Sequence, residues 1–413
     1  ISCVRARLAT LKEKVNTYPA YRLWMRSCST SQPEFGNCSL RWIWFEMKHS
    51  QLEQAVLVFP ATHPDGQKYL EAARERDENV VAASSVWDAE LAEEVGELVV
   101  LPYVHGQMFP THFLELVRAR NITRVYAPVA AVYSWLGRFI SENNLAIRLI
   151  GDSPIKREME RFNRLMNKAA NYRHFIDECA GGTSDLSNLE IAAVFRMAGN
   201  IYGESNEHKI AAMMAIFSSV PKGDVIEIGS LVGKSAAVLA LLARRYQIGN
   251  VLAIDPWQSE AATQHDSPRT VRVDMVGEWE YEILPQDFVI NLLPVGLGSF
   301  NYLRQESARG FEIFRKNHRV ESQAFGQVDY QGKIAIIHID GNHDYAQVKL
   351  DCELWLPLMA QDGWLILDDY LWVHGDGPRR VGDTLLERRA QDIERAFVCG
   401  KALFVKFGRA VQL

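Results

Sequence analysis

Four side chains near the end of the chain are of types that bind metal ions or move protons. Asp340 and His343 follow the largely apolar run Ile334–Ile339, and the pair Asp368 and Asp369 follows a second apolar run. Runs of this kind are typical of strands that are buried on both faces of a parallel sheet. Because sites in such sheets lie at the carboxyl ends of the strands, we expect all four side chains on one rim. Three carboxylates and an imidazole at one edge make a candidate metal-and-base site.

Each of these residues also has a purely structural interpretation. Asp368 could cap a strand end, Asp369 could hydrogen-bond the backbone, and His343 could be a solvated loop residue. The convergence of three acids favours a metal, because hard cations prefer oxygen ligands. A hydrolase metal site would look the same on these residues alone. His338 lies inside the first run and is predicted to be a core residue.

A glycine loop lies further upstream, between a predicted strand and an Ala- and Leu-rich helix. The sequence DVIEIGSLVGKS places Gly229, Ser230 and Gly233 in this loop, and Lys234–Tyr246 is the predicted helix. Glycines let the backbone approach a ligand, and the N-terminus of the helix faces it. The next strand ends at Asp255, roughly 20 residues past the loop, where an acid can accept both hydroxyls of a ribose.

Three kinds of binding site use such a loop. The run from Gly229 to Ser235 looks like the phosphate-binding motif GxxxxGK[ST] but is one residue short, and the third glycine of GxGxxG is absent. The sequence EIGSLVGKS, followed by AIDPW, resembles the class I S-adenosylmethionine-dependent methyltransferases. In that family the loop packs on the methionine part of the cofactor and the acid holds the ribose. The resemblance implies cofactor contacts from Glu227, Gly229, Ser230, Gly233, Ser235 and Asp255, with Trp257 beside the adenine.

The stretches IDGNHDY and GWLILDDY resemble those of metal-dependent O-methyltransferases of the same fold, which include enzymes acting on deoxysugars of macrolide antibiotics. The resemblance covers roughly residues 200–413. It implies that Asp340, Asp368 and Asp369 bind a divalent ion, usually Mg²⁺, and that Asp340 and His343 are catalytic, with His343 as general base. The chemistry agrees, because a metal lowers the pKa of a bound hydroxyl and a histidine can take its proton.

Candidate substrate contacts lie between and after these motifs. Residues 259–332 are longer than a simple crossover needs, and we expect them to form an insertion at the rim that covers the site. Tyr302 and Arg304 in this segment are predicted to contact substrate. His374 follows the acidic pair on a predicted rim loop, where it either meets substrate or only orders the loop.

The first part of the chain predicts a second, smaller α/β domain. Strand-like and helix-like segments alternate over residues 51–155, in a pattern that resembles the small domain preceding ATP-grasp domains. No ATP-grasp body follows, so we expect a scaffold or dimerisation role first and substrate docking second. Residues 156–204 are predicted to be a helical linker and 205–413 the methyltransferase domain. Residues 1–50 receive no assignment. At the other end, a helix is predicted over Asp383–Arg395 and a closing antiparallel strand near Arg409–Gln412.

The composition indicates a soluble protein with more than one domain. A chain of 413 residues is longer than one hydrophobic core usually organises. The net charge of −6 gives no support to nucleic-acid binding through a bulk basic surface. No apolar run reaches transmembrane length, so we expect no membrane partner. Scattered cysteines without CxxC spacing suit a reducing compartment, which predicts a cytoplasmic protein. The sequence begins with Ile1 rather than Met, as a segment of a longer polypeptide would.

The sequence as a whole therefore predicts a Rossmann-like α/β protein that transfers a methyl group from S-adenosylmethionine to a hydroxyl of a sugar or another natural product, with help from a divalent metal. A metal-independent N- or C-methyltransferase of the same fold is the first alternative. A non-catalytic ligand-binding or assembly protein is the second. The identity of the acceptor and the presence of a homo-oligomer stay open.

Overall fold

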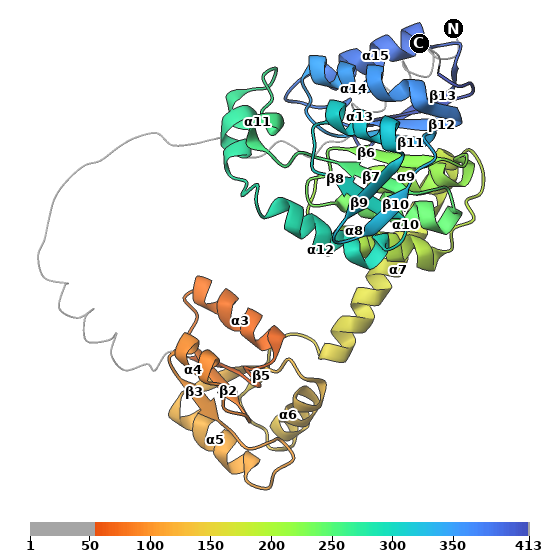
Figure 1. Cartoon of the computed structure of the whole chain (residues 1–413). Helices are drawn as coiled ribbons and strands as arrows, with labels where there is room; N and C mark the ends of the chain where they lie inside the picture. Colours follow the sequence, from red (N-terminus) through yellow and green to blue (C-terminus); the bar gives the residue numbers. More distant parts are fainter. Residues whose placement is uncertain (1–53, 412–413) are drawn as a thin grey trace, which may run out of the picture. The chain divides into compact units, whose positions relative to one another are not determined.

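The computed structural model describes residues 54–411 of the chain. The chain divides into two compact units, Ile1–Gly151 and Asp152–Leu413. Each is a mixed α/β unit with its own sheet (Figure 1). The unassigned residues 1–50 lie outside the described part. None of the helices in residues 54–411 combines the length and the apolar character that crossing a bilayer requires.

The first unit contains a five-stranded parallel sheet in the order β3-β2-β1-β4-β5. Its strands are β1 (Ala55–Val58), β2 (Val80–Ser84), β3 (Leu98–Val100), β4 (Ile122–Tyr126) and β5 (Arg148–Leu149). All four residues of the central strand β1 are buried, as its unbroken apolar sequence predicts.

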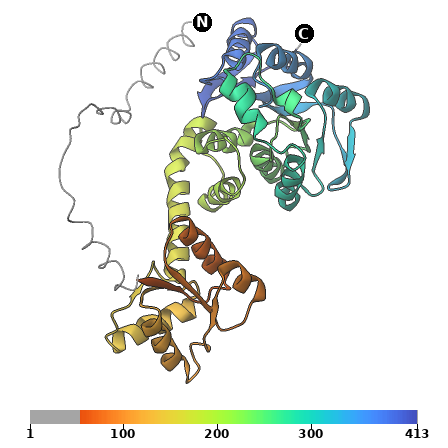
Figure 2. The same cartoon turned by 90° about the vertical axis from the view of Figure 1, so that its left-hand side faces the viewer.

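Helices cover both faces of this first sheet (Figure 2). They are α3 (Pro64–Glu75), α4 (Ala89–Val95), α5 (Phe109–Ala119) and α6 (Ala130–Glu142). Apolar residues of α5 and α6 pack on one face, and Leu70 of α3 and Leu91 of α4 pack on the other. The helix α4 was not predicted, although the sequence contains its N-cap residue. This residue is Asp88, whose side chain accepts a hydrogen bond from Leu91 N at 3.0 Å.

The second unit contains a seven-stranded sheet in the order β13-β14-β12-β11-β6-β7-β8. Its strands are β6 (Asp224–Ile228), β7 (Val251–Ile254), β8 (Phe300–Leu303), β11 (Ile334–Ile339), β12 (Met359–Leu367), β13 (Ile393–Cys399) and β14 (Ala402–Phe407). The pairs from β12 to β8 are parallel, whereas β14 runs antiparallel to both β12 and β13. The sheet is Rossmann-like. Its antiparallel strand is β14, whereas residues 409–411 form no strand, although the closing antiparallel strand was predicted near Arg409–Gln412.

Two groups of helices enclose the sheet of the second unit (Figure 1). One face is covered by α7 (Pro154–Ala180), α8 (Asn188–Gly199), α9 (Glu207–Ile216), α10 (Lys234–Tyr246) and α12 (Leu284–Gly296). The other face is covered by α13 (Ser307–Asn317), α14 (Tyr345–Trp355) and α15 (Gly377–Arg388). Successive residues of a strand point to opposite faces, so Val225 joins the first core and Ile226 the second.

Two expectations for the second unit are corrected. Residues 259–332 are more than a rim insertion, because they supply the edge strand β8, which pairs with β7, and the helices α12 and α13. The helix expected over Asp383–Arg395 ends earlier, at Arg388, since Ile393 already belongs to β13. In each case a sheet edge pairs residues that local sequence periodicity assigns elsewhere.

Candidate active site

Backbone hydrogen bonds between neighbouring strands bring the predicted residues to one edge of the second sheet. Asp340 N donates to Ile228 O at 2.8 Å, and Asp368 N donates to Ile339 O at 2.9 Å. Gly229, the first residue of the glycine loop, directly follows Ile228. The loop after β6 and the acids after β11 and β12 therefore lie together, as the sequence predicts.

Two glycines of the loop hold positions that no other residue could take without displacement. Gly229 has φ +80°, and a Cβ built there would lie 2.2 Å from the carbonyl oxygen of Asp340. Gly233, which precedes α10, has φ +92°, and its Cβ would lie 2.3 Å from Cδ2 of Leu292. The loop is thus pressed between the end of β11 and α12. Ser235 in the first turn of α10 is buried.

Asp255 organises the glycine loop through its carboxylate. One oxygen, Oδ2, accepts from Ser230 N at 2.8 Å and from Leu231 N at 3.1 Å, and Oδ1 accepts from Trp257 N at 2.8 Å. Burial raises the pKa of Asp255 above its usual value, against the effect of these three N–H groups. A carboxylate has about four acceptor positions, so capacity for one further donor remains. The predicted ribose contact of Asp255 stays a prediction.

Two large residues beside Asp255 have backbone conformations that usually favour glycine. Leu231 has φ +48° and Trp257 has φ +45°. For such residues this region costs on the order of 1–2 kcal/mol each, and such strain clusters at functional sites. The Trp257 indole donates to Leu231 O at 2.7 Å, and its ring, 2% exposed, packs against Phe288 and Tyr302. The ring that was expected beside an adenine is therefore enclosed here by the core.

A buried polar chain connects the loop with the acidic rim. Ser230 Oγ donates to Glu227 Oε2 at 2.7 Å, and Glu227 Oε1 lies 3.0 Å from Nδ1 of His338. His338 Nε2 lies 3.6 Å from Asp340 Oδ2. Burial lowers the pKa of His338, so its imidazole is neutral. His338 is a core residue as predicted, but it is also a member of this chain, and Glu227 has both oxygens engaged within it.

Lys209 of α9 is a member of the site that the sequence analysis missed. Its ammonium lies 3.1 Å from Asp340 Oδ2 and contacts Asp368 Oδ2, and its side chain is 1% exposed. Every residue from Lys209 to Ile216 is buried. The available signal was a lysine that opens an otherwise apolar helical run, and that pattern is also typical of a solvated first turn.

The ionic state of the acids follows from this contact. Burial alone would lower the pKa of Lys209, but the charges of Asp340 and Asp368 raise it above its ordinary value. Burial would likewise raise the pKa of Asp368, but Lys209 holds it below its usual range. Burial and the neighbouring charge of Asp368 raise the pKa of Asp340 well above normal. Lys209 and Asp368 therefore form a charged pair, with Asp340 beside it.

His343 and the second acid of the pair form another contact on the rim. Nε2 of His343 lies 3.3 Å from Asp369 Oδ2, and Lys401 Nζ lies 2.9 Å from Asp369 Oδ1. Burial lowers the pKa of His343, although Asp369 and Asp368 oppose the shift. Nδ1 of His343 is buried without a hydrogen-bond partner in the described part of the chain. The ring packs edge-on against Trp372.

The predicted metal ligands meet, but they do not fit an ion shared by all three acids. The ammonium of Lys209 occupies the position between Asp340 and Asp368, where a bridging ion would have to lie. Two smaller groups have ligand atoms within 4.8 Å of one another. One is His338, Asp340 and Asp368, in which Lys209 contacts both acids, and the other is Asp340, His343 and Asp369. Oδ2 of Asp368 is thus engaged by the lysine, and its Oδ1 accepts a hydrogen bond from Asp369 N at 2.9 Å.

The predicted substrate residues separate into two groups. Tyr302 packs in the core against Trp257, and Arg304 pairs with Glu282 at 3.2 Å on the surface. Neither residue lines the pocket described next. His374 is exposed and packs edge-on against Trp372, the same ring that contacts His343. Of the three residues, only His374 lies close to the candidate base.

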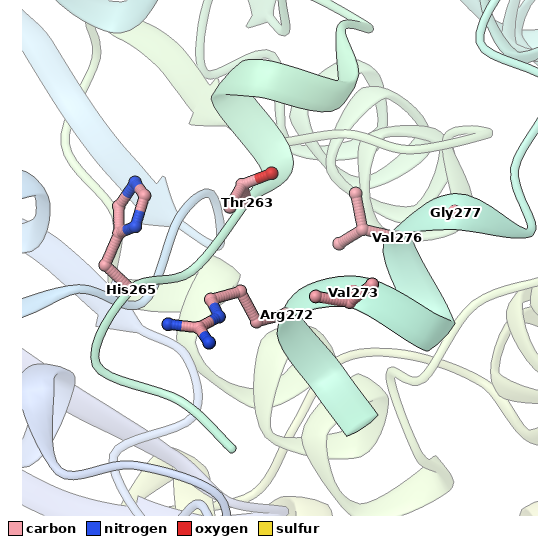
Figure 3. A pocket seen from close by; sticks show the side chains of 6 residues that line it. All are labelled: Thr263, His265, Arg272, Val273, Val276 and Gly277. Carbon is pink, nitrogen blue, oxygen red and sulfur yellow. The ribbon is translucent and has the colours of Figure 1, made fainter. Parts of the chain in front are cut away.

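A pocket of about 450 Å³ lies beside the rim and is lined by Thr263, His265, Arg272, Val273, Val276 and Gly277 (Figure 3). The π-helix Thr270–Met275 carries Arg272, whose guanidinium extends toward the His265 side. Asn342 Nδ2 donates to Thr263 O at 2.8 Å, and His265 N donates to Asp344 Oδ2 at 2.8 Å. These bonds fix one wall of the pocket to the loop that carries His343.

Residues 226–370 match the family model described as a methyltransferase domain. This range contains the glycine loop, the acidic rim and most of the parallel strands of the Rossmann-like sheet. The second unit is thus similar to methyltransferase domains over this range. No curated protein matches the chain.

Several methyltransferases are among the solved structures to which the chain is similar. The O-methyltransferase NovP is 15% identical over 54% of this chain and 99% of its own, with a TM-score of 0.40. The calicheamicin methyltransferase CalS11 is 14% identical over 63% and 95%, with a TM-score of 0.36. MycE from the mycinamycin biosynthetic pathway, in complex with Mg, SAH and mycinamycin VI, is 13% identical over 56% and 57%, with a TM-score of 0.34.

Proposed function

We propose that the second unit transfers a methyl group from S-adenosylmethionine to a hydroxyl oxygen of a small acceptor of the sugar or natural-product type. The observation that carries the proposal is the junction of two predicted parts. The Asp255-bound glycine loop and the rim that holds Asp340 and His343 meet at Gly229, where a Cβ would lie 2.2 Å from Asp340 O. Cofactor loop and candidate base thus share one edge of the sheet.

The cofactor is proposed to bind along the loop that Asp255 organises. S-adenosylmethionine, when bound, supplies an electrophilic methyl group on a sulfonium. Asp255 has acceptor capacity left for a ribose hydroxyl. Gly229, Gly233 and the first turn of α10 would line the rest of the site, with Trp257 nearby. Glu227 would not contact the cofactor itself but would orient Ser230, whose hydroxyl donates to it.

His343 is the proposed general base. Its lowered pKa keeps the ring neutral at physiological pH, which is the form that accepts a proton. In the tautomer whose Nε2–H donates to Asp369, the unpartnered Nδ1 carries the free lone pair. Asp369 then fixes the orientation of the ring and stabilises the imidazolium that forms, as an acid does in a histidine–aspartate pair. A hydroxyl needs such a base because it is a weak nucleophile until its proton leaves.

The acceptor is proposed to enter through the pocket beside this loop. Its volume of about 450 Å³ suits a small molecule. Arg272, Thr263 and His265 offer polar contacts on its wall, and apolar contact comes from Val273 and Val276. Since Thr263 O and His265 N are bonded to the 342–344 loop, an acceptor there would lie next to His343.

A divalent ion enters the proposal only as an alternative. The group Asp340, His343 and Asp369 would hold it, and such an ion, when bound, would lower the pKa of an acceptor hydroxyl. His343 would then be a ligand and not the base. Chelation separates the two forms, because only the metal-dependent form loses turnover after exhaustive EDTA treatment.

Calorimetry with S-adenosylmethionine and S-adenosylhomocysteine tests the proposed function directly. We expect saturable binding of both to the full chain, and weaker binding to Asp255→Asn. Methyl transfer from labelled cofactor to a panel of hydroxylated sugars and glycosylated natural products then tests the acceptor class. Absence of binding at millimolar cofactor would contradict the proposal and favour a non-catalytic role.

A further inference from the structure

Lys209 joins three separate elements of the second unit at one point. It lies on α9, and its ammonium contacts Asp340 after β11 and Asp368 after β12. The side chain is 1% exposed, and the helix that carries it is buried from Lys209 through Ile216. The ammonium is therefore buried in the second unit, in contact with both acids.

The burial of α9 holds this ammonium at the acids. An unpaired ammonium is expensive to remove from water, so a fully buried lysine needs its carboxylate partners. The side chain has almost no exposed surface through which its charge could reach solvent. Moving Nζ away from these acids would leave a buried ammonium and the buried carboxylate of Asp368 unpaired, with the half-buried Asp340 beside them, which the fold strongly disfavours.

A divalent ion between these acids and the ammonium exclude one another. Magnesium binds carboxylate oxygens at about 2.0–2.1 Å. The oxygens that it would have to bridge, Oδ2 of Asp340 and Oδ2 of Asp368, are the two that Lys209 contacts. Two cations at the same pair of oxygens would also repel each other strongly in a buried site.

The other buried acids of the rim already have partners. Asp369 contacts Lys401 and His343, and Glu227 is bound to Ser230 and His338. Each acid of the candidate site thus has a partner from the chain itself.

We propose that Lys209 is a built-in cation at the acidic rim, which takes the place of a divalent ion between Asp340 and Asp368. It is a positioning residue that fixes both acids next to His343. Asp368 is consequently not a metal ligand in this protein. The inference on metal binding does not depend on the identity of the acceptor. Only the measurements of turnover rest on the proposed methyl transfer.

Binding of Mn²⁺, followed by electron paramagnetic resonance and calorimetry on the full chain, tests the proposal without any substrate. For the unaltered protein we expect no Mn²⁺ binding that depends on Asp368, so Asp368→Asn should leave the titration unchanged. Lys209→Met removes the competing charge, and we expect it to bind Mn²⁺ at least about tenfold more tightly than the unaltered protein. The added Asp368→Asn change should abolish that gain.

Matched variants separate the role of this one lysine from a general loss of positive charge. Lys222→Met, in the same unit, removes an exposed ammonium that donates to Tyr246 O at 3.1 Å, and it should leave Mn²⁺ binding unchanged. Turnover should survive chelation in the unaltered protein. In Lys209→Met, Mn²⁺ should restore activity that chelation removes.

Two results would overturn the inference. One is Mn²⁺ binding to the unaltered protein that Asp368→Asn abolishes. The other is a folded Lys209→Met protein, shown by circular dichroism, that gains no Mn²⁺ affinity. If Lys209→Met does not fold, the comparison of the unaltered protein with Asp368→Asn decides alone. Failure of the proposed function is recognised separately, by the absence of S-adenosylmethionine binding.

Discussion

The two units of this chain arrange their first five strands in the same order and differ in what lies at the strand ends. In the first unit the order is β3-β2-β1-β4-β5, and in the second the corresponding parallel strands run β8-β7-β6-β11-β12. Both units therefore place the ends of a first and a fourth strand side by side, at the position where sheets of this type commonly bind ligands.

The contents of the two edges differ in buried charge. Among the described residues of the first unit, Ser84 is the only buried polar residue, and its hydroxyl lies 3.0 Å from that of Thr62. In the second unit the buried polar residues include Lys209, Asp224, Glu227, His338, Asp351, Asp368 and Asp369. The same topology thus supplies an edge in both units, but among the described residues buried titratable groups are found only in the second.

Backbone strain shows the same contrast. In the described part of the first unit, the residues other than glycine with positive φ are Asp77, Asn121 and Asn144, types that tolerate this conformation. In the second unit Leu231 and Trp257 adopt it, and they lie beside Asp255. Large residues hold such a conformation only where their surroundings enforce it, as at ligand sites.

The largest expected effect comes from the proposed base. His343→Ala should lower turnover by roughly 10²–10⁴-fold, because no base is then left to take the proton from the substrate hydroxyl. Binding of S-adenosylmethionine, measured by calorimetry, should stay within a factor of a few. His112→Ala, an exposed histidine of the first unit, should change neither quantity. Turnover that persists in His343→Ala would show that His343 is not the general base.

The pH dependence of turnover sharpens this prediction. Because burial lowers the pKa of His343, the neutral ring persists to a lower pH than in an ordinary histidine. Activity should therefore decline only as pH falls below the usual histidine range, through the lowered pKa. A midpoint above that range, in a pH series of kcat/KM, would contradict the assignment.

Glycine-to-alanine substitutions in the two units can be compared by their effect on the free energy of unfolding. Gly229→Ala should destabilise the second unit by about 2–5 kcal/mol, from the positive φ and from the Cβ that would meet Asp340 O. Gly96→Ala, in the first unit, has a positive φ but no atom within 4 Å, and should cost only about 1–2 kcal/mol. Denaturant unfolding of the two proteins measures both. Equal losses would show that the contact at Gly229 carries no strain of its own.

The acid proposed to hold the cofactor should affect affinity more than it affects folding. Asp255→Asn removes the charge and turns one acceptor oxygen into an NH2 group that faces a backbone N–H, which should weaken S-adenosylmethionine binding by about 10–100-fold. Asp329→Asn alters an exposed acid paired with Arg319 and should leave the affinity unchanged. Normal cofactor binding by the Asp255→Asn protein would show that Asp255 does not hold the ribose.

The smallest effect concerns a buried acid away from the rim. Burial raises the pKa of Asp351 on α14 to about 6. The folded protein therefore binds a proton more tightly than the unfolded chain, so stability should fall as pH rises from about 4 to 6 and then level off. Asp351→Asn should be more stable than the unaltered protein at pH 8, by on the order of 2 kcal/mol, and equal at low pH. Glu353→Gln, an exposed change on the same helix, should show no such difference in thermal unfolding.

The sequence was sufficient for the features that depend on local pattern. The apolar runs of β6, β11 and β12, the glycine loop and the acids at the strand ends could all be predicted, because strand burial and strand direction determine where such residues meet. The edge strand β8 was missed because its pairing with β7 is not visible in four residues of sequence.

The part of the site that could not be predicted depends on packing across the sheet. Lys209 lies 131 residues before Asp340, and only the docking of α9 on one face of the sheet brings them together. Likewise, the partners of Glu227 follow from the register that places His338 beside it on β11. Residue types at strand ends indicate where a site lies, but which charges neutralise which is a property of the tertiary structure.

The position of Lys209 also constrains how the second unit is assembled. Its two acids lie 131 and 159 residues further along the chain. During synthesis the lysine appears long before either acid, and α9 cannot bury its ammonium until β11 and β12 have joined the sheet. Docking of α9 and completion of the sheet are therefore one cooperative event. A chain cut before β12 would leave α9 with a charged residue in its apolar surface and without Asp368.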